Sequence, residues 1–177
     1  ERGMKPAVVQ TLWEQIETFA AYGFNKAHAA SYGNLAYKTA YMKANYPVDY
    51  MAAVLTADAG DVDKISEVVN ECKRMGSNIL PPSVNESRGN FTVVDDTTIR
   101  FGLYSIKNFG TGVADSIIAE REKKGRFEDV SDFVSRIADK NLNKKSMESL
   151  IQSGALDELG ERGQLLSNIE RLLEFHR

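Results

Sequence analysis

Apolar residues recur at helical spacing in short segments along almost the whole chain, and glycine or proline marks several of the breaks between them. A spacing of three to four residues is typical of amphipathic helices, and it limits the chain to a mainly α-helical fold. The expected helices span 6–21, 27–45, 49–57, 61–75, 113–122, 130–137, 144–153 and 162–175. The helix over 27–45 is rich in Ala and Tyr nearly all round, so we expect it to be packed on several sides.

Strand-like residues are confined to one short region. Two β-favouring runs, 91–94 and 98–101, flank Asp95-Asp96-Thr97, which predicts a small β-hairpin. The preceding stretch "NILPPSVNESRG" contains Pro81-Pro82, and we expect it to be irregular. The fold class is therefore mainly α, with several helices and a small β-hairpin, followed by further short helices.

Charge and cysteine content restrict the function. The chain carries 22 Lys and Arg against 25 Asp and Glu, a net charge of −3, so any nucleic-acid binding must be local. The single cysteine, Cys72, cannot form an internal disulfide, which fits the cytoplasm. No signal peptide and no apolar run near the ~20 residues of a membrane helix is visible, so we expect no membrane partner. The opening "ERGMK" reads as the start of a piece of something longer.

The stretch "GFNKAHAASY" places cations at the expected start of a helix. Asn25 is a good N-cap, so Lys26 and His28 fall in the first turn, where each exposed cation costs about 0.3–1 kcal/mol. That arrangement makes sense if phosphate or another anion binds there. Ser31 and Tyr32, one turn further, would add hydroxyl or stacking contacts. The alternative from the residues alone is a solvated Lys26 with His28 and Tyr32 as packing.

The stretch "GLYSIKNFGTGVADSIIAER" predicts a helix-hairpin-helix: a short helix over 103–107, a turn over 108–110 and a second helix. Such a turn presents successive backbone N–H groups as an anion nest, which holds a DNA phosphate without net positive charge. A glycine turn between packed helices also needs no ligand, and that alternative stays open. The candidate DNA-binding residues here are Lys107, Asn108, Gly110, Thr111 and Gly112.

A third stretch, "LNKKSMESLIQSG", repeats the arrangement of cations at a helix start. Asn143 is the expected N-cap, and Lys144 and Lys145 follow it in the first turn. Both lysines are candidate DNA-binding residues, with a solvated surface as the alternative.

No catalytic or metal site is predicted within the chain. Asp58, Asp61 and Asp63 lack the calcium-loop pattern and are explained by capping and turn roles. The chain contains no CxxC, HExxH, GxSxG or GxxxxGK[ST] motif and only two histidines.

Several long stretches resemble one family. The segment "FAAYGFNKAHAASYGNLAYKTAYMKANYPVDYMAAVLT" is similar to the fingers region of the bacterial C-family replicative polymerases, the DNA polymerase III alpha subunits. The similarity continues, in the same order, through "ECKRMGSNILPPSVNES", "IRFGLYSIKNFGTGVADSIIAER" and "LNKKSMESLIQSGALDELG". The family often has Gly where Asn108 stands, and Asn tolerates the left-handed geometry that such a turn requires.

The resemblance implies a fragment of a DNA-directed DNA polymerase, a nucleotidyltransferase. Residues 1–102 would be the distal fingers, 103–160 a tandem helix-hairpin-helix DNA-binding region, and 161–177 the start of the following helix. The fingers would bind the incoming deoxynucleoside triphosphate, with Lys26 and His28 near the polyphosphate and Tyr32 near the base pair. The hairpins would bind the sugar-phosphate backbone of the primer-template DNA.

Catalysis in this family uses two metal ions, expected to be Mg²⁺, on palm aspartates that have no counterpart in this chain. The resemblance thus implies that the fragment alone is inactive and that other polymerase III holoenzyme subunits are partners of the parent chain. Two alternatives remain: a stand-alone helix-hairpin-helix DNA-binding module without enzymatic activity, and a structural helical interaction domain.

Overall fold

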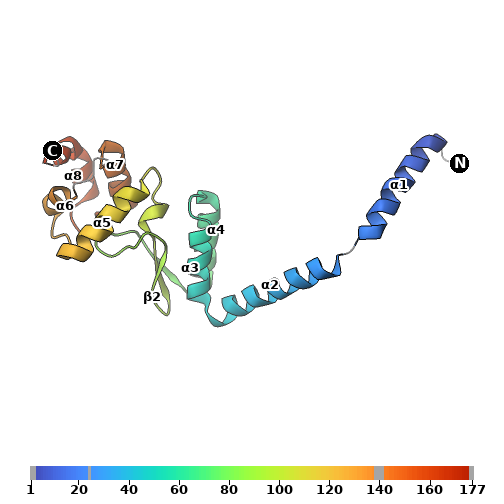
Figure 1. The fold of residues 1–177 in the computed structure, drawn as a ribbon. Coiled ribbons are helices and arrows are strands. Elements are labelled where there is room, and N and C mark those ends of the chain that lie inside the picture. Colours follow the sequence, from blue (N-terminus) through green and yellow to red (C-terminus); the bar gives the residue numbers. More distant parts are fainter. Residues whose placement is uncertain (1–2, 24, 138–141, 176–177) are drawn as a thin grey trace. The chain divides into compact units, whose positions relative to one another are not determined.

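The computed structural model describes residues 3–23, 25–137 and 142–175. It divides into two units, residues 1–45 and residues 46–177, and each is described by itself. Helices dominate both units, and the described strands form one small sheet in the second unit (Figure 1). The predicted fold class is confirmed.

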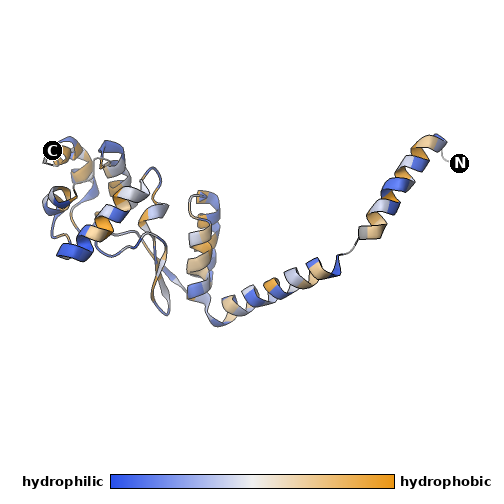
Figure 2. Cartoon of the chain, viewed as in Figure 1, coloured by the Kyte–Doolittle hydropathy of each residue, from blue (hydrophilic) through white to orange (hydrophobic). Residues whose placement is uncertain are grey.

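The first unit consists of two helices, α1 (Pro6–Tyr22) and α2 (Lys26–Asn45). Polar and apolar residues follow one another along α1 (Figure 2), but its apolar side chains are exposed; they include Val8, Leu12, Trp13, Ile16 and Phe19. α2 buries none of its residues within the described chain, so the expected packing on several sides is not found there. A unit of two helices has too few neighbours to enclose a side chain.

The second unit begins with α3 (Pro47–Ala57) and α4 (Val62–Arg74), which pack on a three-stranded sheet. The strands are β1 (Asn78–Leu80), β2 (Thr92–Asp95) and β3 (Thr98–Arg100), in the order β1-β3-β2. The antiparallel β2–β3 pair confirms the predicted hairpin, whereas β1, parallel to β3, lies in a stretch expected to be irregular. The core here is formed by Val48, Met51, Ala52, Leu55, Cys72, Phe91 and Ile99.

The rest of this unit is helical. A 3₁₀ turn, η1 (Leu103–Ser105), precedes the helices α5 (Thr111–Lys124), α6 (Val130–Arg136), α7 (Lys144–Ser153), α8 (Arg162–Ser167) and α9 (Ile169–Phe175). The helix predicted over 103–107 is thus only a short 3₁₀ turn. The single helix predicted over 162–175 is divided at Asn168, whose side-chain amide donates to the carbonyl of Gln164 (2.9 Å) and closes α8.

These helices enclose the larger core of the second unit. Its members come from η1, the helices α5 to α9 and the segments between them, and include Leu103, Ile106, Phe109, Val113, Ile117, Phe133, Met147, Leu150, Leu156, Leu165 and Ile169. Val84, from the stretch after β1, is also part of this core.

Hydrogen bonds fasten the irregular segment 83–88 to the helices. Arg121 on α5 donates to the carbonyl oxygens of Val84 (2.8 Å) and Ser87 (2.9 Å), and burial lowers the pKa of its guanidinium. The side chain of Asn85 donates to the carbonyl of Phe127 (3.0 Å) and accepts from its N–H (2.8 Å). Buried backbone groups need such partners, so this stretch is held in place without regular structure.

Within the described ranges, the search for a helix with the length and apolarity to cross a membrane finds none.

Candidate nucleic-acid interface

The turn before α5 has the geometry of a tight hairpin between helical segments. Asn108 adopts a left-handed conformation with φ of 60°, as expected for an Asn at this position. The N–H of Phe109 donates to the carbonyl of Ile106 (3.2 Å), and the Phe109 ring is buried in the core. Gly110 is the N-cap residue of α5, and the buried Phe109 ring before it fixes the direction of the backbone at the helix start.

The start of α5 is open. No side chain caps it and its first turn contains no acidic residue. In the described chain, the N–H groups of Gly110, Thr111 and Gly112 have no acceptor. Free N–H groups and the helix dipole together make such an end attractive to an anion.

Neither Gly110 nor Gly112 is required by the fold. Both lie outside the positive-φ glycines of the described chain, and Gly110 has φ of −77°. A Cβ atom built at either position would meet nothing within 4 Å. The absence of a side chain at both positions therefore leaves the helix start accessible to a close ligand.

The charges around this helix start favour an anion. Lys107 is exposed and forms no ion pair in the described chain. The first acidic residue of α5, Asp115, accepts a hydrogen bond from the hydroxyl of Tyr104, and this contact raises the pKa of Tyr104. The structure thus gathers all five candidates of the first hairpin, Lys107, Asn108, Gly110, Thr111 and Gly112, at one exposed helix start.

The start of α7 is closed by its own residues. Asn143 Oδ1 accepts from the N–H of Ser146 (3.1 Å), and the Asn143 N–H donates to Ser146 Oγ (2.8 Å), a capping box that confirms the predicted N-cap. Lys144 Nζ lies 2.9 Å from Glu170 Oε1 on α9, whereas Lys145 is exposed and has no ion pair within the described residues. The hydrogen bond raises the pKa of Lys144 and lowers that of Glu170.

The contact with Glu170 was not predicted. The two residues are 26 positions apart, and no local pattern links them. DNA contacts by Lys144 and Lys145 stay predictions, but Lys144 has a competing carboxylate within reach.

The start of α2 carries the other candidate site. Asn25 Oδ1 accepts from the N–H of His28 (3.0 Å), which confirms Asn25 as the N-cap. The rings of His28 and Tyr32 lie 4.4 Å apart, and both side chains are exposed, so they do not fill a core within the described chain. Ser31 Oγ donates to the carbonyl of Ala27 (2.9 Å), which leaves only its acceptor capacity for a ligand. Lys26 is exposed, and no acidic residue lies in the first turn.

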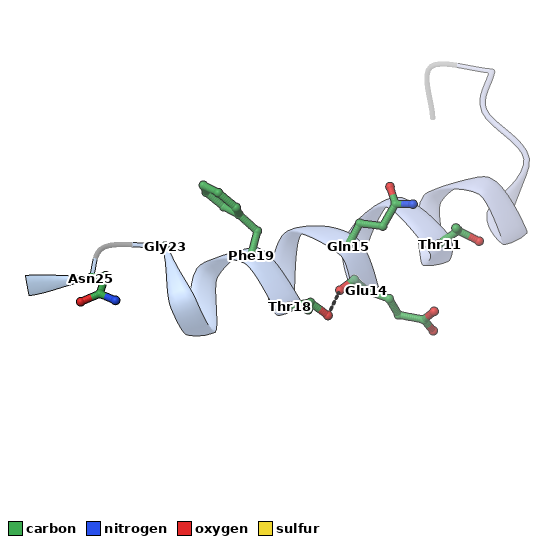
Figure 3. Close-up of a pocket in the computed structure, with 7 residues that line it drawn as sticks. All are labelled: Thr11, Glu14, Gln15, Thr18, Phe19, Gly23 and Asn25. Atoms are coloured by element: carbon green, nitrogen blue, oxygen red, sulfur yellow. Dashed lines mark hydrogen bonds between the residues drawn. The ribbon is translucent and has the colours of Figure 1, made fainter. Parts of the chain in front are cut away.

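A hollow of about 710 Å³ lies beside α1, close to this candidate site (Figure 3). Figure 3 shows Phe19 and Glu14 projecting from α1 and Asn25 beyond the C-terminal end of that helix. Asn25 lines it, but Lys26, His28 and Tyr32 do not. Because the lining carries the carboxylate of Glu14 and no cation, the hollow does not fit a polyphosphate.

The part of the chain that the structure describes does not fit a catalytic metal centre. Among the described residues, no group of three or more His, Cys, Asp or Glu side chains is placed to hold a metal ion. Asp61 caps α4 by accepting from the N–H of Lys64 (3.2 Å), and the Lys64 ammonium lies 3.8 Å from Asp58. These acids therefore have structural roles, and no reaction step through a metal is derived from this chain.

The hairpin geometry agrees with the comparison with known families. Residues 76–165 match the family described as the helix-hairpin-helix motif, and the chain belongs to this family. Nearly the whole chain is also similar to DNA polymerase III alpha subunits, which confirms the resemblance found in the sequence.

Three relatives illustrate this similarity. The DNA polymerase III subunit alpha of Deinococcus radiodurans is 45% identical over 98% of the chain, and that of Thermus aquaticus is 44% identical over 99%. The Mycobacterium tuberculosis subunit is 47% identical over 89% of the chain. The chain spans only 13–14% of the length of these relatives.

Proposed function

We propose that the chain acts as a part of a DNA polymerase III alpha subunit, a DNA-directed DNA polymerase, and that it contacts primer-template DNA through its first hairpin. In this proposal residues 1–102 are the distal fingers, 103–160 the tandem helix-hairpin-helix region and 161–177 the start of the following helix. The observation that carries it is the open start of α5, where two glycines serve no role in the fold. The similarity over nearly the whole chain supports the same assignment.

The proposed DNA contact is made to the sugar-phosphate backbone. A phosphate oxygen at the start of α5 accepts from the free N–H groups of Gly110, Thr111 and Gly112, and the Lys107 ammonium contributes a positive charge. Such a contact carries no sequence information, and it requires no net positive charge on the protein. This resolves the conflict between DNA binding and a net charge of −3.

The second proposed contact is to the incoming deoxynucleoside triphosphate. Lys26 and His28 at the start of α2 would face the polyphosphate, with Ser31 as an acceptor and Tyr32 near the base pair. The cap by Asn25 and the exposure of the Lys26, His28 and Tyr32 side chains support this proposal. Phosphate oxygens would then compensate for cations at the positive end of the helix dipole.

Nucleotidyl transfer itself belongs to other parts of such a polymerase. Mg²⁺ ions on carboxylates outside the described residues would supply the charge stabilisation that this reaction needs. The chain alone is then inactive, and other holoenzyme subunits are its partners through the longer polymerase. A cytoplasmic location is part of this proposal, and the buried free thiol of Cys72 fits a reducing compartment.

The DNA contact is tested with a matched pair of lysines on the first hairpin. Lys107 precedes the start of α5, and Lys123 lies in its last turn; both are exposed and unpaired in the described chain. Lys107→Ala should weaken binding of a duplex oligonucleotide and reduce the slope of log K against log salt by about one unit, while Lys123→Ala leaves both unchanged. Fluorescence anisotropy at several salt concentrations measures this. Equal behaviour of the two variants contradicts the proposed contact.

The nucleotide contact is tested in an intact polymerase that contains this chain. Lys26→Ala should raise the KM for deoxynucleoside triphosphates about five- to tenfold, because it removes a charge-assisted contact to phosphate. Lys38→Ala, an exposed lysine further along α2, is the control and should leave KM unchanged. Steady-state incorporation kinetics provide both values, and an unaltered KM in Lys26→Ala would count against the triphosphate site.

A stand-alone DNA-binding module is the second candidate function. The family match covers residues 76–165 and leaves out α1 and α2, which favours a hairpin module that acts by itself. The two candidates differ at Lys26: a module without polymerase activity gives a Lys107 effect on DNA binding and no nucleotide effect of Lys26.

A further inference from the structure

A second hollow, of about 510 Å³, lies beside the first hairpin turn and within the second unit. The chain reaches it from three places: Pro81 and Pro82 after β1, Phe101 after β3, and the turn that carries Lys107 and Asn108. The C-terminal half of α7 forms its remaining side, with Gln152. Its volume is within the range of roughly 300–1,000 Å³ that small-ligand pockets occupy.

The lining combines apolar and polar groups. Pro81 is exposed and Phe101 is half-buried, so these two residues offer apolar surface, while Pro82 is buried behind them. Lys107, Asn108 and Gln152 are exposed and supply the polar groups. No acidic side chain is among the residues that line the hollow, so its only formal charge is the positive one of Lys107.

The apolar side of the hollow is held in place by hydrogen bonds. The N–H of Phe101 donates to the carbonyl of Leu80 (3.0 Å), and the carbonyl of Phe101 accepts from Ser87 Oγ (2.7 Å). Arg100 donates to the carbonyl of Pro81 (3.2 Å). A ligand would therefore meet a preformed surface, which lowers the entropic cost of binding.

Two carboxamides are available at the rim. The side chains of Asn108 and Gln152 have no hydrogen-bond partner in the part of the chain that the structure describes. A carboxamide offers both a donor and an acceptor, which matches the edge of a nucleobase. Aromatic and other flat apolar side chains provide surfaces on which an unpaired base can stack.

We propose that this hollow takes an unpaired nucleotide of the DNA strand that the first hairpin holds. The base lies against Phe101 and the prolines, Gln152 and Asn108 pair with its edge, and its phosphate lies toward Lys107. This inference rests on the proposed DNA contact, because Lys107 and Asn108 belong both to the hollow and to the turn before α5.

A peptide is the other occupant that an apolar hollow suggests, and the lining favours it less. An extended peptide binds through the N–H and C=O groups of an exposed strand edge. Pro81 and Pro82 have no N–H to offer on this side. The lining has one lysine and no acidic residue, which matches a phosphate-bearing ligand better.

The test compares two DNA duplexes bound by the full 177-residue chain. One carries a single 2-aminopurine opposite an abasic position, so that the base is unpaired; in the other the same base is paired. The chain should bind the first duplex about two- to tenfold more tightly and quench its fluorescence, because a hydrogen bond and stacking are gained only there. Anisotropy gives the ratio of the two affinities.

Three variants locate the effect. Gln152→Ala should bring the affinity ratio close to one, whereas Gln164→Ala, an exposed glutamine on α8 away from the hollow, should preserve it. Asn108→Gly should also lower the ratio, because glycine keeps the left-handed turn while removing the carboxamide. A ratio of one in the unaltered chain, or equal ratios in Gln152→Ala and Gln164→Ala, overturns the inference while leaving duplex binding intact.

Failure of the proposed function is distinguished by a separate probe. If the chain binds neither duplex, the DNA contact is wrong, and titration with deoxyadenosine monophosphate then examines the hollow alone by NMR. Shifts of the Gln152 side-chain amide signals, absent for Gln164, would support a nucleotide in the hollow. No shift there, or saturable binding of an apolar peptide that Gln152→Ala abolishes, assigns the hollow to something other than a nucleotide.

Discussion

The starts of α5 and α7 look alike in the sequence and differ in the structure. Each is expected to bind DNA, and each has lysine nearby. The start of α5 has no side-chain cap, while α7 is closed by the Asn143–Ser146 capping box. The lysine before α5 is unpaired within the described residues, whereas Lys144 contacts Glu170. A helix start can bind an external anion only where its backbone N–H groups have no acceptor within the protein.

This difference predicts unequal roles for the two helix starts. The first has free N–H groups and glycines whose Cβ positions face open space, so its proposed phosphate contact needs no rearrangement. At the second, a phosphate must displace Glu170 from Lys144, and the cap by Asn143 already satisfies one N–H group. We therefore expect most of the DNA affinity to come from the α5 side.

The largest expected effect is that of Thr111→Asp, which adds a carboxylate to the open start of α5. Acidic residues are favourable in the first helical turn, so the folded state should be unchanged or more stable by about 0.3–1 kcal/mol. The same carboxylate occupies the proposed phosphate position and repels it, so duplex affinity should fall about tenfold or more. Thermal unfolding and fluorescence anisotropy measure the two quantities.

The control for added charge is Gln164→Glu, an isosteric change on the exposed surface of α8. It alters the net charge by the same amount, and duplex affinity should change by less than about twofold because screening weakens distant charges. Similar losses in Thr111→Asp and Gln164→Glu would mean that overall charge, and not the start of α5, governs binding.

A smaller effect is expected from Asn143→Ala at the start of α7. Removal of the cap takes away the hydrogen bond from the Ser146 N–H to Asn143 Oδ1 and should lower the free energy of unfolding by about 1 kcal/mol. Duplex affinity should change little, because that N–H group was not available to DNA. Urea denaturation measures the stability, and a large loss of DNA affinity in a fully folded variant would erase the distinction between the two helix starts.

Local features of this fold were predictable from the sequence. Asn25 and Asn143 were identified as caps because a cap depends on residues three positions apart. The β2–β3 hairpin and the extents of α2 and α7 follow in the same way from local pattern. The helix-hairpin-helix assignment depends on a short glycine turn and was confirmed.

Contacts between distant positions were not predictable. β1 is only three residues long, and its existence depends on pairing with β3, about twenty positions away. The ion pair of Lys144 with Glu170 and the place of Gln152 in a hollow beside Asn108 arise only when helices pack. The helix starts of the candidate site were thus predictable from the sequence. Glu170, which competes for Lys144, and Gln152, which lies in the hollow with Asn108, were not.

The smallest effect concerns Glu170→Gln, which removes the carboxylate that competes for Lys144. Duplex affinity should rise about twofold, since an exposed ion pair is weak and its loss frees one lysine for phosphate. Glu67→Gln, an exposed residue on α4, is the control and should have no such effect. A gain much larger than twofold would show that α7 contributes as much to DNA binding as α5.

The Lys144–Glu170 ion pair makes the stability of the fold depend on pH. Lys144 lowers the pKa of Glu170 below its usual value of 4.5, so the ion pair stabilises the folded state above that pH. As the pH falls through the lowered pKa, Glu170 is protonated and the contribution is lost. The unaltered chain should therefore be slightly more stable than Glu170→Gln near neutral pH, and the two should converge in acid. Denaturation curves across that range measure the convergence. A difference in stability that persists at the lowest pH would mean that Glu170 stabilises the fold by packing and not through its charge, so that it does not compete with DNA for Lys144.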